Sequence, residues 1–287
     1  MPEIAIVGDI HGAFGETDVA AFNESDYDLL LFTGDLPSFP WARSLRPVAR
    51  QLSRLQKPAL LIPGNHDIHN PVQFLAAIFR WGWLARPAGW RMPAHHRALQ
   101  RWVEPVEVAG YSTHSFSVRG DSFAVVSGRP YSMGGPAISY GSFLKNAYNV
   151  QTMADSAALI KEQVDATMAD RVIFLGHNGP AGLSGAPDSI WGRDFGPGEG
   201  DWGDPDLQEA ITYARVQGKE VVAVAAGHMH RETGQGQWRR WHVQHDGTHY
   251  VNAAHVSRII RQDGETKRHH VRLALTPAGT VVEDRCW

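Results

Sequence analysis

The chain has 287 residues, a length that one large α/β domain can accommodate, and no long linker divides it. Its 27 basic and 30 acidic residues give a formal net charge of −3, which excludes an overall positive field for nucleic acid or an anionic membrane. The single cysteine, Cys286, excludes an intramolecular disulfide and a thiolate metal cluster, and it favours a reducing compartment.

Apolar runs and helical patterns alternate along most of the chain. Short apolar runs bounded by turn residues predict buried strands at residues 4–7, 29–33, 59–62, 123–127, 172–175 and 221–226. Between several of them, helices are predicted at residues 47–55, 71–79 after an Asn70 cap, 151–168, and 205–215 after an Asp204 cap. This alternation predicts an α/β layered fold, which we expect to be a single domain over residues 1–287.

The C-terminal part has a different pattern. Predicted strands at residues 250–253, 271–275 and 281–283 are separated by Gly and Pro turns rather than by helices. We expect these strands to close a second sheet.

Neither a secretion signal nor a membrane span is apparent in the sequence. The chain opens with MPEIAIVGDIHG, which leads directly into a strand and a chemical motif. No apolar stretch reaches the length of a membrane span. We therefore expect a cytoplasmic protein without a membrane partner, while the oligomeric state does not follow from the sequence.

Five polar clusters come just after predicted strands. They are Asp9 and His11 in GDIHG, Asp35 in GDLPS, Asn65, His66 and Asp67 in GNHD, His177 in GHNGP, and His228 and His230 in GHMH. In layered α/β folds, the loops beyond the carboxyl ends of the strands converge on one crevice, so these side chains can meet there. A glycine precedes each cluster, and we expect it to permit the sharp turn that lifts the side chain out of the sheet.

The donor types in these clusters suit divalent metal ions. Carboxylate oxygens and imidazole nitrogens without sulfur favour Mn, Fe, Zn or similar ions, and a shared carboxylate can bridge two of them about 3.5 to 4 Å apart. The Asp-x-His and His-x-His spacings place alternate residues on the same side of an extended segment. These side chains supply enough ligands to bind two metal ions.

The order and residue pattern of the clusters resemble the motifs of the calcineurin-like metallophosphoesterase superfamily, which are DxH, GDxxD, GNH(D/E), a later His and GHxH. The resemblance spans residues 9–230 and implies an α/β/β/α sandwich of two mixed sheets flanked by helices. The family's last acidic position in GDxxD is Ser38 here, which leaves the expected ligands intact. The later motifs HNGPAGLSG, GEGDWGDPDL and VNAAHVSR also resemble a branch of the superfamily found in cyanobacteria and chloroplasts.

The resemblance implies roles for individual residues. One ion would be held by Asp9, His11 and His230, a second by Asn65, His177 and His228, and Asp35 would bridge both. His66 would contact the phosphate and assist the leaving group, oriented by Asp67.

The implied activity is metal-dependent hydrolysis of a phosphoester, with a metal-bound hydroxide as the nucleophile. We expect a small phosphomonoester or phosphodiester as the substrate. The alternatives are a nuclease of the same superfamily and a catalytically silent metal-binding scaffold. Protein phosphatases of the superfamily usually carry GDxVDRG, whereas this chain has GDLPSFP, so a phosphoprotein substrate is disfavoured.

A segment at about residues 70–105 is expected to be a helical insert rich in arginine and tryptophan. It carries Arg80, Arg86, Arg91, Arg97 and Arg101 with Trp81, Trp83, Trp90 and Trp102, and residues 80–102 contain no acidic side chain. These residues could bind phosphate or stack a base. We favour the alternative that the tryptophans anchor the insert while the arginines lie at its surface, and we expect no nucleic acid partner.

Two further sets of polar residues have simpler interpretations. Asp188, Asp194, Asp201, Asp204 and Asp206 lack the spacing of a calcium-binding EF-hand loop, so we expect a long ordered loop that borders the active site. The remaining histidines are expected to be mostly solvated or structural: His69, His95, His96, His114, His242, His245, His249, His255, His269 and His270.

Overall fold

The structure is a computed structural model that describes residues 1–38, 44–68, 70–79, 81, 83–84, 87, 89–195 and 200–287. The expectations for His69, Arg80 and Arg86 lie outside these residues. Within the described ranges, no helix is both long enough and apolar enough to cross a bilayer.

The strands of the described residues form two mixed sheets. The first has the order β11-β12-β1-β2-β3-β4, with β13 paired to β12, and contains β1 (Glu3–Val7), β2 (Leu29–Phe32), β3 (Ala59–Leu61), β4 (Glu107–Val108), β11 (Ile259–Gln262), β12 (Glu265–Thr276) and β13 (Gly279–Cys286). The second has the order β5-β6-β7-β8-β10-β9 and contains β5 (Thr113–Val118), β6 (Asp121–Ser127), β7 (Arg171–Leu175), β8 (Glu220–Ala226), β9 (His242–His245) and β10 (Thr248–Asn252).

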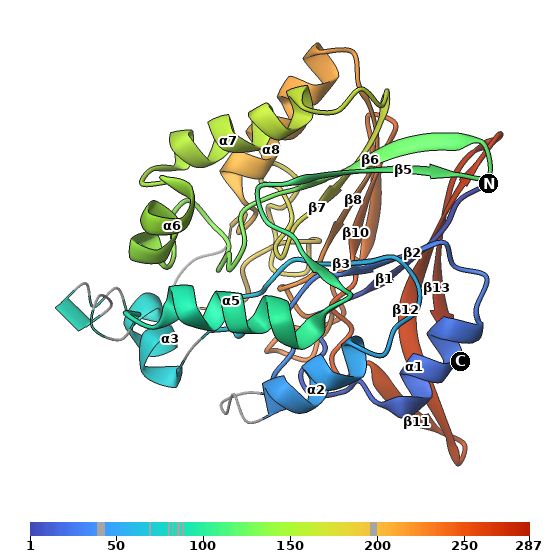
Figure 1. The fold of residues 1–287 in the computed structure, drawn as a ribbon, viewed down its shortest axis with the longest axis horizontal. Helices are drawn as coiled ribbons and strands as arrows, with labels where there is room; N and C mark the ends of the chain where they lie inside the picture. The colour runs from blue at the N-terminus through green and yellow to red at the C-terminus, as the bar shows by residue number, and fades with distance from the viewer. Residues whose placement is uncertain are drawn as a thin grey trace.

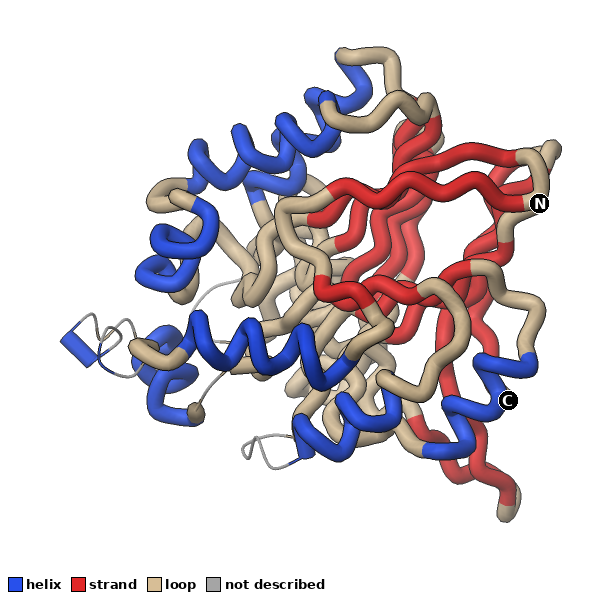
Figure 2. Tube along the Cα trace, viewed as in Figure 1, coloured by secondary structure: helices blue, strands red, loops and turns tan. Residues whose placement is uncertain are grey.

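The helices cover the two outer faces of the paired sheets. Those packed on the first sheet are α1 (Glu16–Glu24), α2 (Leu45–Leu52) and α5 (Met92–Val103), and those packed on the second are α6 (Gly141–Tyr148), α7 (Met153–Asp165) and α8 (Pro205–Val216). In Figure 1 these two groups lie below and above the sheets, and α3 (Pro71–Ile78) lies at the left end of the molecule. The same layers are visible by element type in Figure 2.

Three apolar cores hold the layers together. A central core lies between the sheets and combines residues such as Ile4 and Ile6 of β1 with Val125 of β6 and Ile173 of β7. Alternate residues of β1, such as Ala5 and Val7, instead pack against the outer helices of the first sheet. The expected α/β/β/α sandwich of two mixed sheets is therefore confirmed.

The C-terminal strands differ from the expectation. Only β10 joins the second sheet, where it pairs in parallel with β8. By contrast, β12 pairs antiparallel with β1 and with β13, so both belong to the first sheet. The long, largely buried strand β12 lies between β1 and two other strands. The expectation that β12 and β13 close a second sheet was therefore wrong.

The predicted helices are present, with ends set by local hydrogen bonds. Asn70 caps α3 by accepting the backbone N–H of Gln73 at 2.9 Å. At α7, Thr152 and Asp155 form a reciprocal capping box, which starts the helix at Met153 rather than at residue 151. Asp204 stands at the N-cap position of α8, but its side chain makes no capping hydrogen bond.

Candidate metal centre

The polar clusters meet where five strands end. Asp9 and His11 follow β1, Asp35 follows β2, and Asn65 follows β3, all in the parallel part of the first sheet. His177 follows β7 and His228 follows β8, which are parallel neighbours in the second sheet. The site therefore draws its side chains from both sheets.

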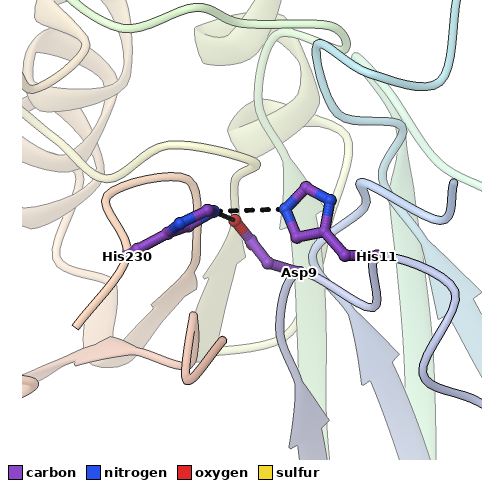
Figure 3. Close-up of side chains that lie close together, drawn as sticks. All are labelled: Asp9, His11 and His230. Atoms are coloured by element: carbon purple, nitrogen blue, oxygen red, sulfur yellow. Dashed lines mark hydrogen bonds and ion pairs between the residues drawn. The ribbon is translucent and has the colours of Figure 1, made fainter. Parts of the chain in front are cut away.

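One cluster consists of Asp9, His11 and His230, whose ligand atoms all lie within 4.8 Å of one another. The Nε2 atoms of His11 and His230 are 3.1 Å apart, and Nε2 of His230 lies 3.5 Å from Oδ2 of Asp9. Figure 3 shows the two imidazole rings on either side of the Asp9 carboxylate. The same carboxylate accepts the backbone N–H of His228 at 3.0 and 3.1 Å, which fixes its orientation.

A second cluster consists of Asp35, His177 and His228, again with ligand atoms within 4.8 Å of one another. Oδ1 of Asn65 lies 2.7 Å from Nε2 of His177 and 2.9 Å from Nδ1 of His228, so Asn65 joins this cluster.

The carboxylate of Asp35 faces both clusters. Its Oδ1 lies 3.6 Å from Nε2 of His177, and its Oδ2 lies 3.8 Å from Nε2 of His11. A single buried carboxylate therefore has one oxygen toward each set of imidazoles.

The imidazoles present lone pairs toward the interior of the clusters. Nδ1 of His177 lies 2.6 Å from the carbonyl of Thr33, to which it can only donate, and Nδ1 of His11 lies 3.2 Å from the carbonyl of Pro37. Burial lowers the pKa of His177, so the ring is neutral near pH 7 and carries one N–H. Its Nε2 then carries a lone pair that faces the amide oxygen of Asn65. A cation bound between the two atoms would accept both lone pairs.

The carboxylates also favour a bound cation. Burial, and then the charge of Asp35, raise the pKa of Asp9 well above its usual value. Burial also opposes ionisation of Asp35, but the neighbouring His177, His66 and His11 outweigh it and hold the pKa of Asp35 below its usual range. Two buried acidic groups that repel each other are stabilised by positive charge between them, and the nitrogen and oxygen donors fit Mn, Fe or Zn.

Asp67 is buried between the loops that follow β2 and β3. Its carboxylate accepts the backbone N–H groups of Asp35, Leu36 and Gly64, each at 2.8 Å. Burial raises the pKa of Asp67 to about 8, although these three donors favour the ionised form. These hydrogen bonds go to backbone, so Asp67 joins the loops after β2 and β3, and its orientation of the His66 ring stays a prediction.

His66 lies beside the clusters. Its backbone N–H donates to Oδ1 of Asp35 at 2.8 Å, and its Nε2 lies 3.9 Å from Oδ2 of the same residue. The ring centroid lies 4.6 Å from that of Phe74 and 5.3 Å from that of His11. Burial lowers the pKa of His66, so its imidazole is mostly neutral at pH 7 when no anion is bound.

The glycines before the clusters are needed for space, and Gly34, with a φ of 98°, is needed for turning as well. A Cβ on Gly64 would overlap Oδ1 of Asp35, and a Cβ on Gly227 would overlap Oδ1 of Asp9. The left-handed backbone falls on the polar residues themselves, with φ of 34° at Asp9, 52° at Asp35 and 67° at His228. Such backbone in non-glycine residues is strained and is concentrated at functional sites.

The site opens into a cavity of about 1080 Å³. Asp35, Asn65, His66, His228 and His230 line the end that holds the clusters. Arg193, Asp194, Phe195 and Trp202 line another part, which confirms that the long acidic loop borders the site.

The carboxylates of that loop are engaged in protein contacts. Asp204 accepts from Arg129 at 3.0 Å and from Ser132 at 2.8 Å, and Asp206 accepts from Arg129 at 2.8 Å. Among the described residues, the candidate metal clusters do not include them. Protein contacts therefore hold the carboxylates of Asp204 and Asp206 in the described part of the loop.

The insert contributes α3 and Gly89 to the cavity wall, and of its four described tryptophans only Trp102 packs on the core. Trp81, Trp83 and Trp90 are 44%, 78% and 69% exposed, so the expectation that they fix the insert to the body was wrong. Trp102 is half-buried and packs under the guanidinium of Arg46 at 4.6 Å.

The sequence interpretation missed the loop after β6. Residues 133–134 and 136–140 of this loop line the cavity together with residues 141–143 of α6, and the hydroxyl of Tyr140 donates to the carbonyl of Asn65 at 3.0 Å. The signal was present, because the segment YSMGGP follows a predicted strand like every other cluster.

Comparisons with known proteins identify one family. A family model described as calcineurin-like phosphoesterase matches residues 2–232. Among solved structures, the phosphopantetheinyl hydrolase of Mycobacterium tuberculosis is 15% identical, with 88% of each chain covered and a TM-score of 0.49. The NAD nucleotidase of Haemophilus influenzae is 11% identical over 99% of this chain and 49% of that chain, with a TM-score of 0.48.

A metallophosphoesterase from Sphaerobacter thermophilus is 13% identical over 99% of this chain and 87% of that chain, with a TM-score of 0.34. No curated protein matches the sequence.

Proposed function

Because the chain belongs to the calcineurin-like phosphoesterase family, we propose that it is a phosphoester hydrolase with a dinuclear metal centre. One observation carries the proposal, namely that the two oxygens of Asp35 face two different clusters of imidazoles. A carboxylate in this position can bind two neighbouring ions at once.

The chain's own residues divide between the two ions. Asp9, His11 and His230 would hold one ion, Asn65, His177 and His228 the other, and Asp35 would bind both. When bound, a pair of Mn, Fe or Zn ions supplies Lewis acidity that activates water and offsets the charge on the phosphate oxygens. The hydrogen bonds from Nδ1 of His11 and His177 to backbone carbonyls hold these rings with Nε2 inward.

His66 is the residue that we propose for proton transfer. It lines the cavity next to Asp35, where a phosphate at the clusters would lie. A phosphate anion beside the ring would favour its protonated form, which can donate a proton to the departing ester oxygen. Phe74 packs on the ring and limits its rotation.

The two alternatives receive less support. A silent scaffold would not need the seven candidate ligands, yet all of them lie in the two clusters or beside them. A nuclease would favour a positive surface at the site, whereas the net charge is −3 and Asp194 and Glu232 line the cavity. We propose a small phosphoester as the substrate and the cytoplasm as the location, and the resemblance to a cyanobacterial and chloroplast branch stays a prediction.

Metal analysis and turnover together test the proposal. The purified protein should hold about two divalent ions and hydrolyse 4-nitrophenyl phosphate or bis(4-nitrophenyl) phosphate with Mn, Fe or Zn. Asp35→Asn should bind at least one ion fewer, and its turnover rate should fall by about 100-fold or more, because the ligand shared by both ions is weakened. Asp26→Asn, at an exposed carboxylate, is the matched control and should behave as the wild type.

Two outcomes would contradict the proposal. Asp35→Asn with full metal content and normal turnover would exclude the shared carboxylate. A wild type that binds two ions but hydrolyses neither ester nor DNA would favour the scaffold.

A further inference from the structure

We infer that the substrate is an amphiphilic phosphoester of lipid type, taken from an anionic lipid surface on which the insert docks. This inference rests on the proposed function, because the metal clusters would bind the phosphate. It goes beyond that function by assigning the apolar part of the substrate to the cavity.

The size of the cavity is the first argument. At about 1080 Å³ it slightly exceeds the range for small-molecule sites, about 300 to 1,000 Å³. Most of the residues that line it belong to neither cluster. A bare phosphate or a short ester would leave most of this volume without a ligand.

The lining away from the clusters is largely apolar. It includes Phe74, Ala77, Ile138 and Phe143, which come from α3, the loop after β6 and α6. Apolar walls gain free energy in proportion to the apolar area that a ligand removes from water. The cavity therefore favours a hydrocarbon chain or a similar apolar group next to the phosphate.

The helix α3 continues this apolar character from the cavity to the outside. Phe74 and Ala77 face the cavity, while Val72, Leu75 and Phe79 are 48%, 42% and 57% exposed. Ile78 both lines the cavity and is 44% exposed, so it lies at the rim. The exposed apolar surface and the cavity are therefore continuous through one short helix.

Beyond α3 the insert presents aromatic and basic side chains to solvent. Trp83 and Trp90 are among the most exposed large apolar residues that the structure describes, and Arg91 stacks on Trp90 at 4.6 Å. Arg97 and Arg101 are exposed on the neighbouring α5, and the sequence has no acidic residue from 68 to 103. Exposed tryptophan with arginine is the composition of segments that lie in an anionic lipid interface.

This surface changes the expectation that a membrane plays no part. The sequence excluded a membrane span, but it could not show that the tryptophans are exposed. A protein partner would also cover an apolar patch, yet it would not account for an apolar cavity that opens beside it.

The chemical step needs no additional reactant. The oxygen of water bonds to phosphorus, the P–O bond of the ester breaks, and the alcohol leaves with a proton. When the apolar group is the alcohol, the products are an apolar alcohol and a phosphate.

Binding of n-alkylphosphonates from methyl to octyl tests the cavity independently of turnover. With the metal-loaded protein, calorimetry should show affinity rising about two- to fourfold per methylene until the cavity is filled. The heat-capacity change of binding should become more negative along the series. Affinity that does not depend on chain length would overturn the inference while leaving the proposed function intact.

Ala77→Trp, which narrows the cavity, should weaken octylphosphonate binding at least tenfold and leave methylphosphonate binding unchanged. Ala20→Trp, on the exposed side of α1, is the matched control and should bind both as the wild type does. If Ala77→Trp does not fold, Ile138→Ser gives the same readout, because it removes apolar contact from the wall. Normal octylphosphonate binding in either folded variant would contradict the assignment of the chain to this cavity.

Flotation with vesicles tests the lipid surface. The wild type should bind phosphatidylglycerol vesicles and release them at high salt, and the double change Trp83→Ser and Trp90→Ser should abolish binding. Trp238→Ser, at a tryptophan that is 62% exposed outside the insert, is the matched control. If the wild type does not bind the vesicles, or if Trp238→Ser reduces vesicle binding as much as the double change does, docking by the insert is excluded.

Discussion

The carboxylate of Asp67 accepts the backbone N–H of Asp35 at 2.8 Å, and the same oxygen accepts the N–H of Gly64 at 2.8 Å. These two donors belong to loops that follow different strands, β2 and β3. Asp35 faces both imidazole clusters, so its position depends on a residue that is not itself in either cluster. The strained φ of 52° at Asp35 is held in part by this contact.

Asp67→Asn should therefore loosen the centre without removing a ligand. An amide has one acceptor oxygen, so at least one of the three N–H donors loses its partner, at a cost of about 1–3 kcal/mol in the free energy of unfolding. Urea unfolding of the metal-free protein and metal titration measure the two effects. Asp165→Asn, where an exposed carboxylate accepts from Tyr213, should change neither. Unchanged stability and metal affinity in Asp67→Asn would show that the contact is dispensable.

Gly64→Ala tests whether the glycines provide space. The added Cβ would overlap the Asp35 carboxylate and the ring of His177, so we expect lower metal content and at least a tenfold loss of activity. The matched variant is Gly185→Ala, because a Cβ there meets nothing within 4 Å. Equal metal content in the two variants would favour the turn-based explanation that the sequence suggested.

His66→Ala separates proton transfer from metal binding. The variant should keep its metal ions and lose turnover, and the loss should be smaller for nitrophenyl esters, whose leaving group needs no proton. His228→Ala is the contrasting variant and should lose metal. An equal loss for good and poor leaving groups would assign His66 to phosphate positioning instead.

Buried histidines on the first sheet make stability depend on pH. Burial lowers the pKa of His270 to about 3, whereas the unfolded residue titrates near its usual value of about 6.5. Between these values the unfolded chain binds a proton that the folded chain does not. The free energy of unfolding is therefore complete above about pH 6.5 and falls as the pH falls through this window.

His270→Phe should remove part of this dependence. From pH 7 to pH 5 the metal-free wild type should lose about 1–2 kcal/mol more than the variant, measured by urea unfolding. His245→Gln, at an exposed histidine, should keep the slope of the wild type. Identical slopes for wild type and His270→Phe would contradict a buried, uncharged His270.

Much of the fold followed from the sequence because its signals are local. Apolar runs such as residues 29–33 and caps such as Asn70 depend on neighbours along the chain, and these elements are confirmed. The sheet that a strand joins is not local, which is why β12 was assigned to the wrong sheet. Pairing of β12 with β1 depends on contacts between Val271 and Ile6, which are far apart in sequence.

The candidate ligands could be predicted because each is a polar residue placed after an apolar strand. The role of Asp67 could not, since the backbone donors that it accepts come from Asp35, Leu36 and Gly64. The exposure of Trp83 and Trp90 was also out of reach, because composition does not show which face a side chain takes. Both features depend on contacts between residues that are distant in the sequence, so the sequence alone could not predict them.

The facing Nε2 atoms of His11 and His230 belong to residues 219 positions apart in the chain. During synthesis from the N-terminus, Asp9 and His11 emerge early, but their cluster has no third member until His230 has left the ribosome. The strand β12, which pairs with β1 beneath Asp9, emerges later still. A chain still in synthesis therefore lacks His230, one of the ligands proposed for the first ion, until residue 230 has been added.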